Sequence, residues 1–279
     1  MSFKPLMLGA AAGAISITAS AQANNPWTYH ESDDAIGRIY YYERTNTDGS
    51  MDERVTVFRR DATHIEVYKE NGLCRRAALV TAKLDLETLS APVITGGALQ
   101  PDARHIEFAF LELSPETGMV DMLVQLPDME IRNDVEIETA TWTLFDFDLA
   151  SFTVATSHLD NPKDGFGFGM ALLWTDPSAA DPLFWMGEVT AEHVGQGEHL
   201  GVFAAEYRLT GSAFEIELST GKEGRLWLDA EDGHVVDAVM PVPNHPGYTD
   251  FRLRLLDVSD GGEAEWTALL RAHFEDCEG

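Results

Sequence analysis

The sequence predicts a mainly β protein, built as a large curved antiparallel sheet or barrel-like meander with a helix near the C-terminus. Strand-like runs recur about every 8–15 residues, with turn clusters between them. Only one long segment has the periodicity of a helix instead. A flat sheet of roughly ten or more strands would expose long edges, so we expect the sheet to be strongly curved or closed.

The first three strands are expected at residues 39–43, 54–58 and 64–68. Apolar and polar side chains alternate in the second and third runs, and β-branched and aromatic residues fill them. Turn clusters at 46–50 and 61–63 separate the runs. We therefore expect an antiparallel meander with one buried face and one solvated face.

A similar turn pattern recurs at residues 84–88, 113–118 and 228–233. An Asp or Ser at the turn entry can bond the backbone two residues on, and a Gly that ends a turn accepts a positive φ. Because the copies are irregularly spaced, they predict a series of separate hairpin turns and not a solenoid repeat. Further strand-like runs lie at 107–111, 120–126, 142–154, 184–194, 201–209, 214–218, 225–228, 235–239 and 250–258.

A helix is expected around Trp266, Leu269, Leu270, His273 and Phe274, which fall on one helical face. The polar segment before it can cap its start, and a strand is the alternative. We expect this helix either to fill the concave face of the sheet as a plug or to leave that face open to an apolar guest.

Residues 1–23 have the pattern of a secretory signal peptide. Lys4 gives a positive start, an uncharged apolar run follows, and Ala-Gln-Ala at 21–23 supplies the small-residue cleavage pattern. We expect residues 24–279 to form a single β-rich exported domain, periplasmic or secreted. Asn24, in place of Cys, predicts no lipid anchor, and no later run reaches the ~20 apolar residues of a transmembrane segment.

The chain is strongly acidic, with 47 Asp and Glu against 19 Lys and Arg and a formal net charge of −28. Such a charge repels phosphate backbones and anionic membrane surfaces, which argues against nucleic-acid binding. The acidic residues are dispersed, which indicates a solvated surface, with a cation-binding surface as the alternative. No G-x-S-x-G, H-E-x-x-H, C-x-x-C or P-loop motif occurs, and no cofactor is expected.

The two cysteines, Cys74 and Cys277, are expected to form a disulfide, because an isolated pair in an exported protein is more often bonded than free. The bond would close a loop of about 200 residues between the first third of the chain and its end. Two buried free thiols are the alternative.

The chain resembles a loose group of exported proteins. It is similar to uncharacterised exported β-rich proteins of Gram-negative bacteria in three features. These are the export signal, the meander, and a hairpin in which the strand with Trp227 and Leu228 leads through Asp229 and Gly233 into the next strand. Some of these resemble the half-barrels that carry lipoproteins and other lipids across the periplasm. The resemblance covers much of residues 24–279, implies a curved sheet with a carrier role, and brings no functional residues with it.

Gly165, Gly167 and Gly169 alternate with Phe166 and Phe168 in a β context. The two rings would share one face of a strand, while the glycines would let a backbone or a ring lie against the other face. Both a packing role and a ligand-lining role are open for this segment.

Residues 142–149 form the most unusual predicted strand. Phe145 and Phe147 would point one way, and Asp146 and Asp148 the other, roughly 7 Å apart by strand rise. Two carboxylates at that spacing can serve glycosidic acid–base chemistry or hold a cation, and otherwise they are simply solvated.

The loop at 244–250 holds His245 and Tyr248 and contains a tight Pro-Gly turn, across which His245 could bond Asp250. A His–Asp pair is half of a nucleophilic triad. The loop is therefore either a structural turn or part of a binding or catalytic site.

A hairpin is expected at residues 195–197, close to His193 and His199. Across such a hairpin the two imidazoles could offer ligands to a zinc-like ion, although exposed hairpin ends often carry these residues. We predict no metal site.

The sequence favours an exported, non-enzymatic binding or carrier protein for an apolar small molecule or an envelope partner. An exported hydrolase that uses His245 with Asp250, or Asp146 with Asp148, is the first alternative. A structural envelope protein whose sheet edges pair with a partner is the second. The candidate binding residues are Trp142, Phe145, Phe147, Phe166, Phe168, Trp185, His245 and Tyr248.

Overall fold

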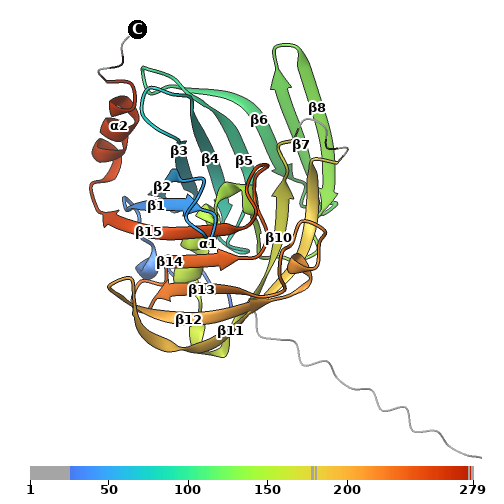
Figure 1. Ribbon diagram of the computed structural model, residues 1–279, viewed down its shortest axis with the longest axis vertical. Coiled ribbons are helices and arrows are strands. Elements are labelled where there is room, and N and C mark those ends of the chain that lie inside the picture. The colour runs from blue at the N-terminus through green and yellow to red at the C-terminus, as the bar shows by residue number, and fades with distance from the viewer. Residues whose placement is uncertain (1–25, 177–178, 180, 276, 278–279) are drawn as a thin grey trace, which may run out of the picture.

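The computed structural model describes residues 26–176, 179, 181–275 and 277, so the predicted signal segment at 1–23 lies outside the described residues. The predicted fold class is confirmed: strands dominate, they form one open curved antiparallel sheet, and a helix follows near the C-terminus (Figure 1). None of the helices in the described part of the chain is long and apolar enough to cross a membrane.

The sheet has fifteen strands. They are β1 (Ile39–Thr45), β2 (Glu53–Asp61), β3 (His64–Glu70), β4 (Ala77–Asp85), β5 (Ser90–Leu99), β6 (His105–Leu113), β7 (Met119–Leu126), β8 (Met129–Glu136), β9 (Trp142–Leu144), β10 (Phe166–Leu173), β11 (Leu183–His199), β12 (Val202–Thr210), β13 (Gly224–Asp229), β14 (Val235–Met240) and β15 (Phe251–Ser259). The α-helices and 3-10 helices (η) are η1 (Glu31–Asp33), η2 (Phe145–Phe147), α1 (Ala150–Ala155), η3 (Thr156–His158), η4 (Pro162–Asp164), η5 (Ser212–Phe214) and α2 (Gly262–Ala272).

Strand order follows the chain except at one place, where β1 pairs with β15 as well as with β2. The strand pairs in the described part of the chain are antiparallel, apart from the short β9, which lies parallel to β10. The sheet therefore starts at β8, passes through the β1–β15 pair in its middle, and ends at β9.

The predicted meander and hairpins are confirmed. Strands β1, β2 and β3 cover the first three predicted runs, and the predicted turns connect β4 to β5, β6 to β7 and β13 to β14. Gly118 and Gly233 have φ values of 72° and 76°, and their N–H groups donate to the carbonyl oxygens of Ser114 and Asp229. Glycine is favoured at both positions because only it adopts this conformation without strain.

The predicted strand at 142–154 is wrong beyond Leu144. Asp148 and Leu149 both adopt the left-handed conformation, with φ values of 48° and 59°, and this reverses the chain between η2 and α1. The run continues through α1 and η3 inside the curve of the sheet, so its apolar residues are buried by the strands around them and not by alternation within a strand (Figure 1). The run at 214–218 also forms no strand, because η5 occupies its start.

The predicted hairpin at 195–197 is wrong as well. Strand β11 continues through these residues to His199, and the turn lies at Leu200 and Gly201, which have φ values of 52° and 82°. Two successive residues with positive φ suit the twist of a two-residue hairpin. Because of this register, His199 pairs with Val202 at the hairpin end, and His193 lies opposite Tyr207.

Helix α2 packs on the outer face of the sheet. Its buried Trp266 and Leu270 contact a cluster that includes Ile39, Phe58 and Tyr68, and the rings of Phe58 and Trp266 stack at 5.3 Å. The residues next to these on the same strands, such as Tyr40, Val57 and Val67, point to the opposite face of the sheet and belong to a larger hydrophobic cluster, the main core. Of the two alternatives for this helix, the one in which it plugs the concave face is therefore wrong. The helix covers part of the outer face of the first strands, which was expected to be solvated.

One part of the interior of the curve is filled by the segment from η2 to η3, residues 145–158, which we call the interior segment. Phe152 on α1 lies 4.4 Å from the ring of Phe168 and 6.2 Å from that of Trp27. Tyr42 Oη and Thr153 Oγ1 are hydrogen-bonded at 2.8 Å, and Val235 N donates to Thr153 Oγ1. Apolar contacts and buried polar contacts together fix this segment against both halves of the sheet.

The predicted disulfide between Cys74 and Cys277 is confirmed, with a Cα–Cα distance of 5.5 Å. It ties the loop at residues 71–76, between β3 and β4, to the end of the chain beyond α2. The N–H of Cys74 also donates to the carbonyl oxygen of His273, and Tyr68 Oη and His273 Nδ1 are hydrogen-bonded at 2.6 Å. The loop is thus held by covalent and polar contacts alike.

The glycine-rich strand has the packing arrangement that its sequence suggested. Phe166 and Phe168 lie in the core, and the indole of Trp185 lies directly on Gly169. A Cβ atom at residue 169 would come within 2.0 Å of Trp185 Cη2, whereas one at Gly167 would have 3.7 Å to its nearest neighbour. Glycine is required at 169 for close packing and not at 167.

We therefore expect Gly169→Ala to lower the free energy of unfolding by about 1–3 kcal/mol, because the added methyl group overpacks the contact with Trp185. Gly167→Ala on the same strand is the matched control, and we expect it to be nearly neutral. Chemical denaturation of both variants measures the difference. Equal stability of the two would contradict the contact.

Candidate functional site

A large cavity lies on the concave side of the sheet, between β3–β8 and the end of β10. Its volume is about 1010 Å³, at the upper end of the range for small-molecule pockets, roughly 300–1,000 Å³. Strands β4 to β8 supply most of the wall, which is largely apolar. Its apolar lining residues include Val80, Ile94, Phe108, Leu111, Met122, Val124, Ile131, Leu144, Phe147, Leu173 and Trp174.

The solvent-exposed residues of the lining mark the mouth of the cavity. They lie in the loop at 71–76, in the β5–β6 turn at Pro101, at the β7–β8 turn, and at Thr175 after β10. Leu126 and Met129 in that last turn are 39% and 42% exposed, although both are large and apolar. The mouth is therefore bordered by turns between strands, and apolar side chains continue to its rim.

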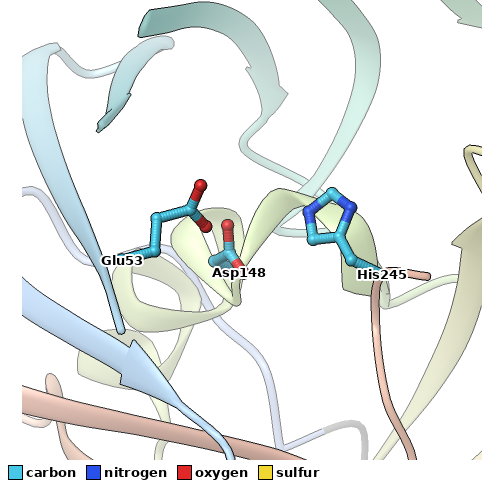
Figure 2. Close-up of side chains that lie close together, drawn as sticks. All are labelled: Glu53, Asp148 and His245. Atoms are coloured by element: carbon cyan, nitrogen blue, oxygen red, sulfur yellow. The ribbon is translucent and has the colours of Figure 1, made fainter. Parts of the chain in front are cut away.

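Part of the cavity lining is charged. Glu53, Lys69, Asp146 and His245 form this floor, which lies near the start of the loop at 71–76 because Arg54 pairs with Glu70 across β2 and β3, and the buried Asp148 contacts it through Lys69. Figure 2 shows how Glu53, Asp148 and His245 come together from β2, the end of η2 and the loop after β14. We call these residues, with Arg44, the floor cluster.

Asp148 is the centre of the floor cluster and is fully buried. Lys69 Nζ lies 2.5 Å from Asp148 Oδ2, and Arg44 Nε lies 3.6 Å from Asp148 Oδ1. Asn244 donates to Asp148 Oδ1 at 2.7 Å and to the carbonyl oxygen of Phe145 at 3.1 Å. The carboxylate is thus held by two cations and one amide.

These contacts explain the chain reversal after η2. A left-handed backbone costs roughly 1–2 kcal/mol at a residue other than glycine, and Asp148 and Leu149 adopt it in succession. Lys69 also donates to the carbonyl oxygen of Asp146 at 2.5 Å, so it bonds the backbone and the side-chain charge of the same turn. The floor cluster therefore stabilises the turn from which the interior segment departs.

His245 pairs with Asp146, and not with Asp250 as predicted. His245 Nε2 lies 2.9 Å from Asp146 Oδ1. Asp250 instead accepts hydrogen bonds from the N–H and the hydroxyl of Thr47 at 2.7 and 2.6 Å. The long-range contact forms because η2 holds Asp146 at the floor, beside the loop that carries His245.

Burial and neighbouring charges together set the pKa values of three ionisable groups in the floor. Burial alone would raise the pKa of Asp146, but His245 and Lys69 outweigh it and hold that pKa below its usual range. Burial and the charge of Asp148 raise the pKa of Glu53 in spite of Lys69 and Arg44. Burial likewise opposes the charge on Lys69, yet Asp148 and Asp146 raise its pKa. The cluster therefore keeps Lys69 and Asp146 charged inside an apolar cavity.

The floor cluster contains the residue types of a metal site. Ligand atoms of Glu53, Asp148 and His245 lie within 4.8 Å of one another. Lys69 and Arg44 already neutralise Asp148, however, so a divalent ion would have to displace Lys69.

A further group with metal-ligand side chains, Asp229, Asp232 and His234, lies at the β13–β14 turn, where Arg38 pairs with Asp232 at 2.7 Å. His193 and His199 form no shared site. His199 stacks on Trp227 at 4.1 Å and pairs with Asp237, whereas His193 lies against Tyr207.

The structure divides the predicted binding residues between cavity and core. Phe147 and His245 line the cavity. Trp142, Phe145, Phe166 and Phe168 are buried in the main core, Trp185 covers Gly169, and the ring of Tyr248 lies 3.4 Å beneath the guanidinium of Arg44. Asp146 and Asp148 lie in and after a 3-10 helix, and both are largely or fully buried instead of solvated.

Sequence reasoning missed the cations of the floor and most of the cavity wall. Lys69 is the last residue but one of β3, and nothing local indicates that it reaches Asp148. The wall residues, such as Val80, Val124 and Ile131, were visible only as ordinary inward positions of strands. These residues line one cavity only because the interior segment leaves that part of the concave face uncovered.

The comparisons with known proteins assign no family. No protein-family model matches the chain, and no curated protein is similar to it in sequence. The chain is similar to a crystal structure described as an outer membrane lipoprotein-sorting protein domain from Vibrio parahaemolyticus, with 9% identity, a TM-score of 0.23, and coverage of 86% of this chain and 94% of that one. At this TM-score the likeness carries no argument, so any function has to be inferred from the geometry of the chain itself.

We expect Asp148→Asn to lower the free energy of unfolding by about 3–5 kcal/mol, because it leaves Lys69 and Arg44 buried without their carboxylate. Asparagine tolerates the left-handed backbone, so the loss reports the charge. Glu130→Gln, which removes the exposed partner of Arg132, should cost less than about 1 kcal/mol. Denaturant titration of the three proteins tests this, and equal losses would refute the role of Asp148.

The lowered pKa of Asp146 gives a pH dependence of known sign. Its folded-state pKa lies below the unfolded value of about 3.9, so its contribution to stability is complete above that value and is lost as the pH falls through the folded-state pKa. We expect the stability difference between wild type and Asp146→Asn to shrink as the pH falls below about 4. Unfolding free energies measured at a series of acidic pH values test this. A difference that grows in acid would be the contrary result.

Proposed function

We propose that this protein is an exported carrier that holds an apolar molecule in the cavity of its curved sheet. The observation that supports this most directly is the cavity itself, about 1010 Å³ in volume, with a largely apolar wall and an open mouth. Apolar surface gains about 25 cal/mol per Å² when it leaves water, so an apolar guest is favoured there. Concave apolar sites with a few placed polar groups are typical of ligand pockets.

The proposed location rests on two features of the chain. The signal pattern at residues 1–23 predicts export, and the Cys74–Cys277 disulfide is a bond that persists in oxidising compartments. A periplasmic or secreted carrier would keep an apolar guest out of water between two surfaces.

The hydrolase alternative has less support from the cavity. His245 and Asp146 form a His–carboxylate pair at its floor, but the described lining residues include no serine, and the sulfur of Cys74 is bonded to Cys277. Thr175 is a hydroxyl residue of the lining, and no hydrogen bond among the described residues joins it to His245. A triad needs a hydroxyl or thiol nucleophile beside the imidazole. We therefore base the proposal on binding.

A neutral apolar dye, N-phenyl-1-naphthylamine, tests the proposal. We expect saturable fluorescence enhancement with the wild type, and at least about tenfold weaker binding with Val124→Glu, because that change places a charge in the apolar wall. Val194→Glu is the matched control, since Val194 is 61% exposed on β11 and does not line the cavity.

The proposal would fail if the wild type gave no saturable signal, or if the two variants bound the dye equally. Thermal unfolding of both variants confirms that a loss of binding is not a loss of fold. Native mass spectrometry of the protein from the exported fraction, without detergent, would then give the mass of a natural guest.

A further inference from the structure

We infer that the carried molecule is an anionic amphiphile, and that Arg75 and Arg76 at the mouth bind its charged headgroup. This inference rests on the proposed carrier function and adds the chemical class of the guest. Both arginines are exposed and both line the cavity at its mouth, in the loop between β3 and β4.

The two guanidinium groups lack acidic partners. Among the described residues, no carboxylate lies within ion-pair distance of either, and the one hydrogen bond of their side chains is a long contact of 3.4 Å from Arg75 Nη1 to the carbonyl oxygen of Asn71. By contrast, the exposed Arg104, Arg132 and Arg208 each pair with a carboxylate. In a chain with 47 acidic and 19 basic residues, two adjacent arginines without an ion-paired carboxylate among the described residues are unusual.

The acids that line the same cavity are already engaged. Glu53 pairs with Arg44, Asp146 pairs with His245, and the carboxylate of Glu70 accepts the N–H of Gly72. Asp176, also in the lining, is not free either. Glu70 keeps its negative charge, because a hydrogen bond from a backbone N–H does not neutralise a carboxylate. The lining cations without an ion-pair partner among the described residues are the two arginines at the mouth, and the wall beyond them is largely apolar.

The loop that carries the arginines is held in place before any guest binds. Cys74, the residue before them, is bonded to Cys277, and the ring nitrogen Nε2 of His273 lies 2.8 Å from the carbonyl oxygen of Arg75. A loop fixed in this way loses little freedom on binding, which favours affinity.

The geometry also sets the orientation of the guest. A guanidinium presents paired N–H donors that match the oxygens of a carboxylate or a phosphate. With the headgroup at the loop at 71–76, an apolar chain would extend inward along Val80, Ile94 and Val124. Carboxylates of fatty acids and phosphates of phospholipids share this chemistry, so the experiment must separate them.

The test is competitive displacement of N-phenyl-1-naphthylamine by three single-chain lipids, each kept below its micelle-forming concentration. Palmitate offers a carboxylate, lysophosphatidylglycerol offers a phosphate, and monopalmitin is neutral. We expect at least one anionic lipid to bind about tenfold or more tightly than monopalmitin. The anionic lipid that does so identifies the source of the headgroup.

In the Arg75→Gln/Arg76→Gln variant we expect this preference to disappear, with the affinity for the dye and for monopalmitin unchanged. Lys163→Gln/Lys222→Gln is the control, because it removes the same charge from two exposed lysines that do not line the cavity. Equal binding of all three lipids by the wild type would overturn the headgroup inference and leave the carrier function standing. Failure of the dye and of every lipid to bind would instead overturn the proposed function.

Discussion

A single curved sheet has to cover its concave face, and here the chain covers only part of it. The interior segment at 145–158 fills one end of the curve, where Phe152 packs among the aromatic rings of β10. The other end is left as the cavity. The position of this segment depends on the reversal at Asp148 and Leu149, so the fold of the core and the volume of the cavity share one structural cause.

The floor cluster lies at the boundary between the filled end and the cavity. A buried ion pair adds little net stability, because the cost of removing both charges from water offsets much of their attraction. The floor cluster instead fixes the geometry of the turn at Asp148. Lys69 bonds the backbone of Asp146 and the side chain of Asp148, and Asn244 bonds the same turn from the other half of the sheet. Wrong placements of the interior segment would leave these charges buried without partners.

Features that depend on residues close together in the sequence could be predicted from it. Strand-forming residues between turn clusters predicted β1 to β3, with alternation in the second and third runs. Helical periodicity predicted α2 around Trp266, and the isolated cysteine pair predicted the disulfide. Features that depend on distant partners could not. The run at 142–154 is apolar enough for a strand, and only Lys69 and Asn244, far away in sequence, explain why it turns inward at Asp148.

The candidate site follows the same division. His245 and Phe147 could be selected because their residue types are distinctive, and both line the cavity. The partner of His245 was misassigned because Asp250 is near in sequence while Asp146 is near in space. The arginines at the mouth carry no motif at all. Their significance comes from the absence of an ion-paired carboxylate among the described residues, which is a property of the folded surface.

The pairing of β1 with both β2 and β15 has a consequence for how the protein is made. Synthesis proceeds from the N-terminus, so β1 emerges early and pairs with β2, while its other edge waits for a strand that is among the last to appear. Until then the nascent sheet presents an open edge of hydrogen-bonding groups to any neighbouring chain. Completion of the sheet is thus a late event, and a chain that stops before β15 would leave both β1 and β14 without a neighbour on that side.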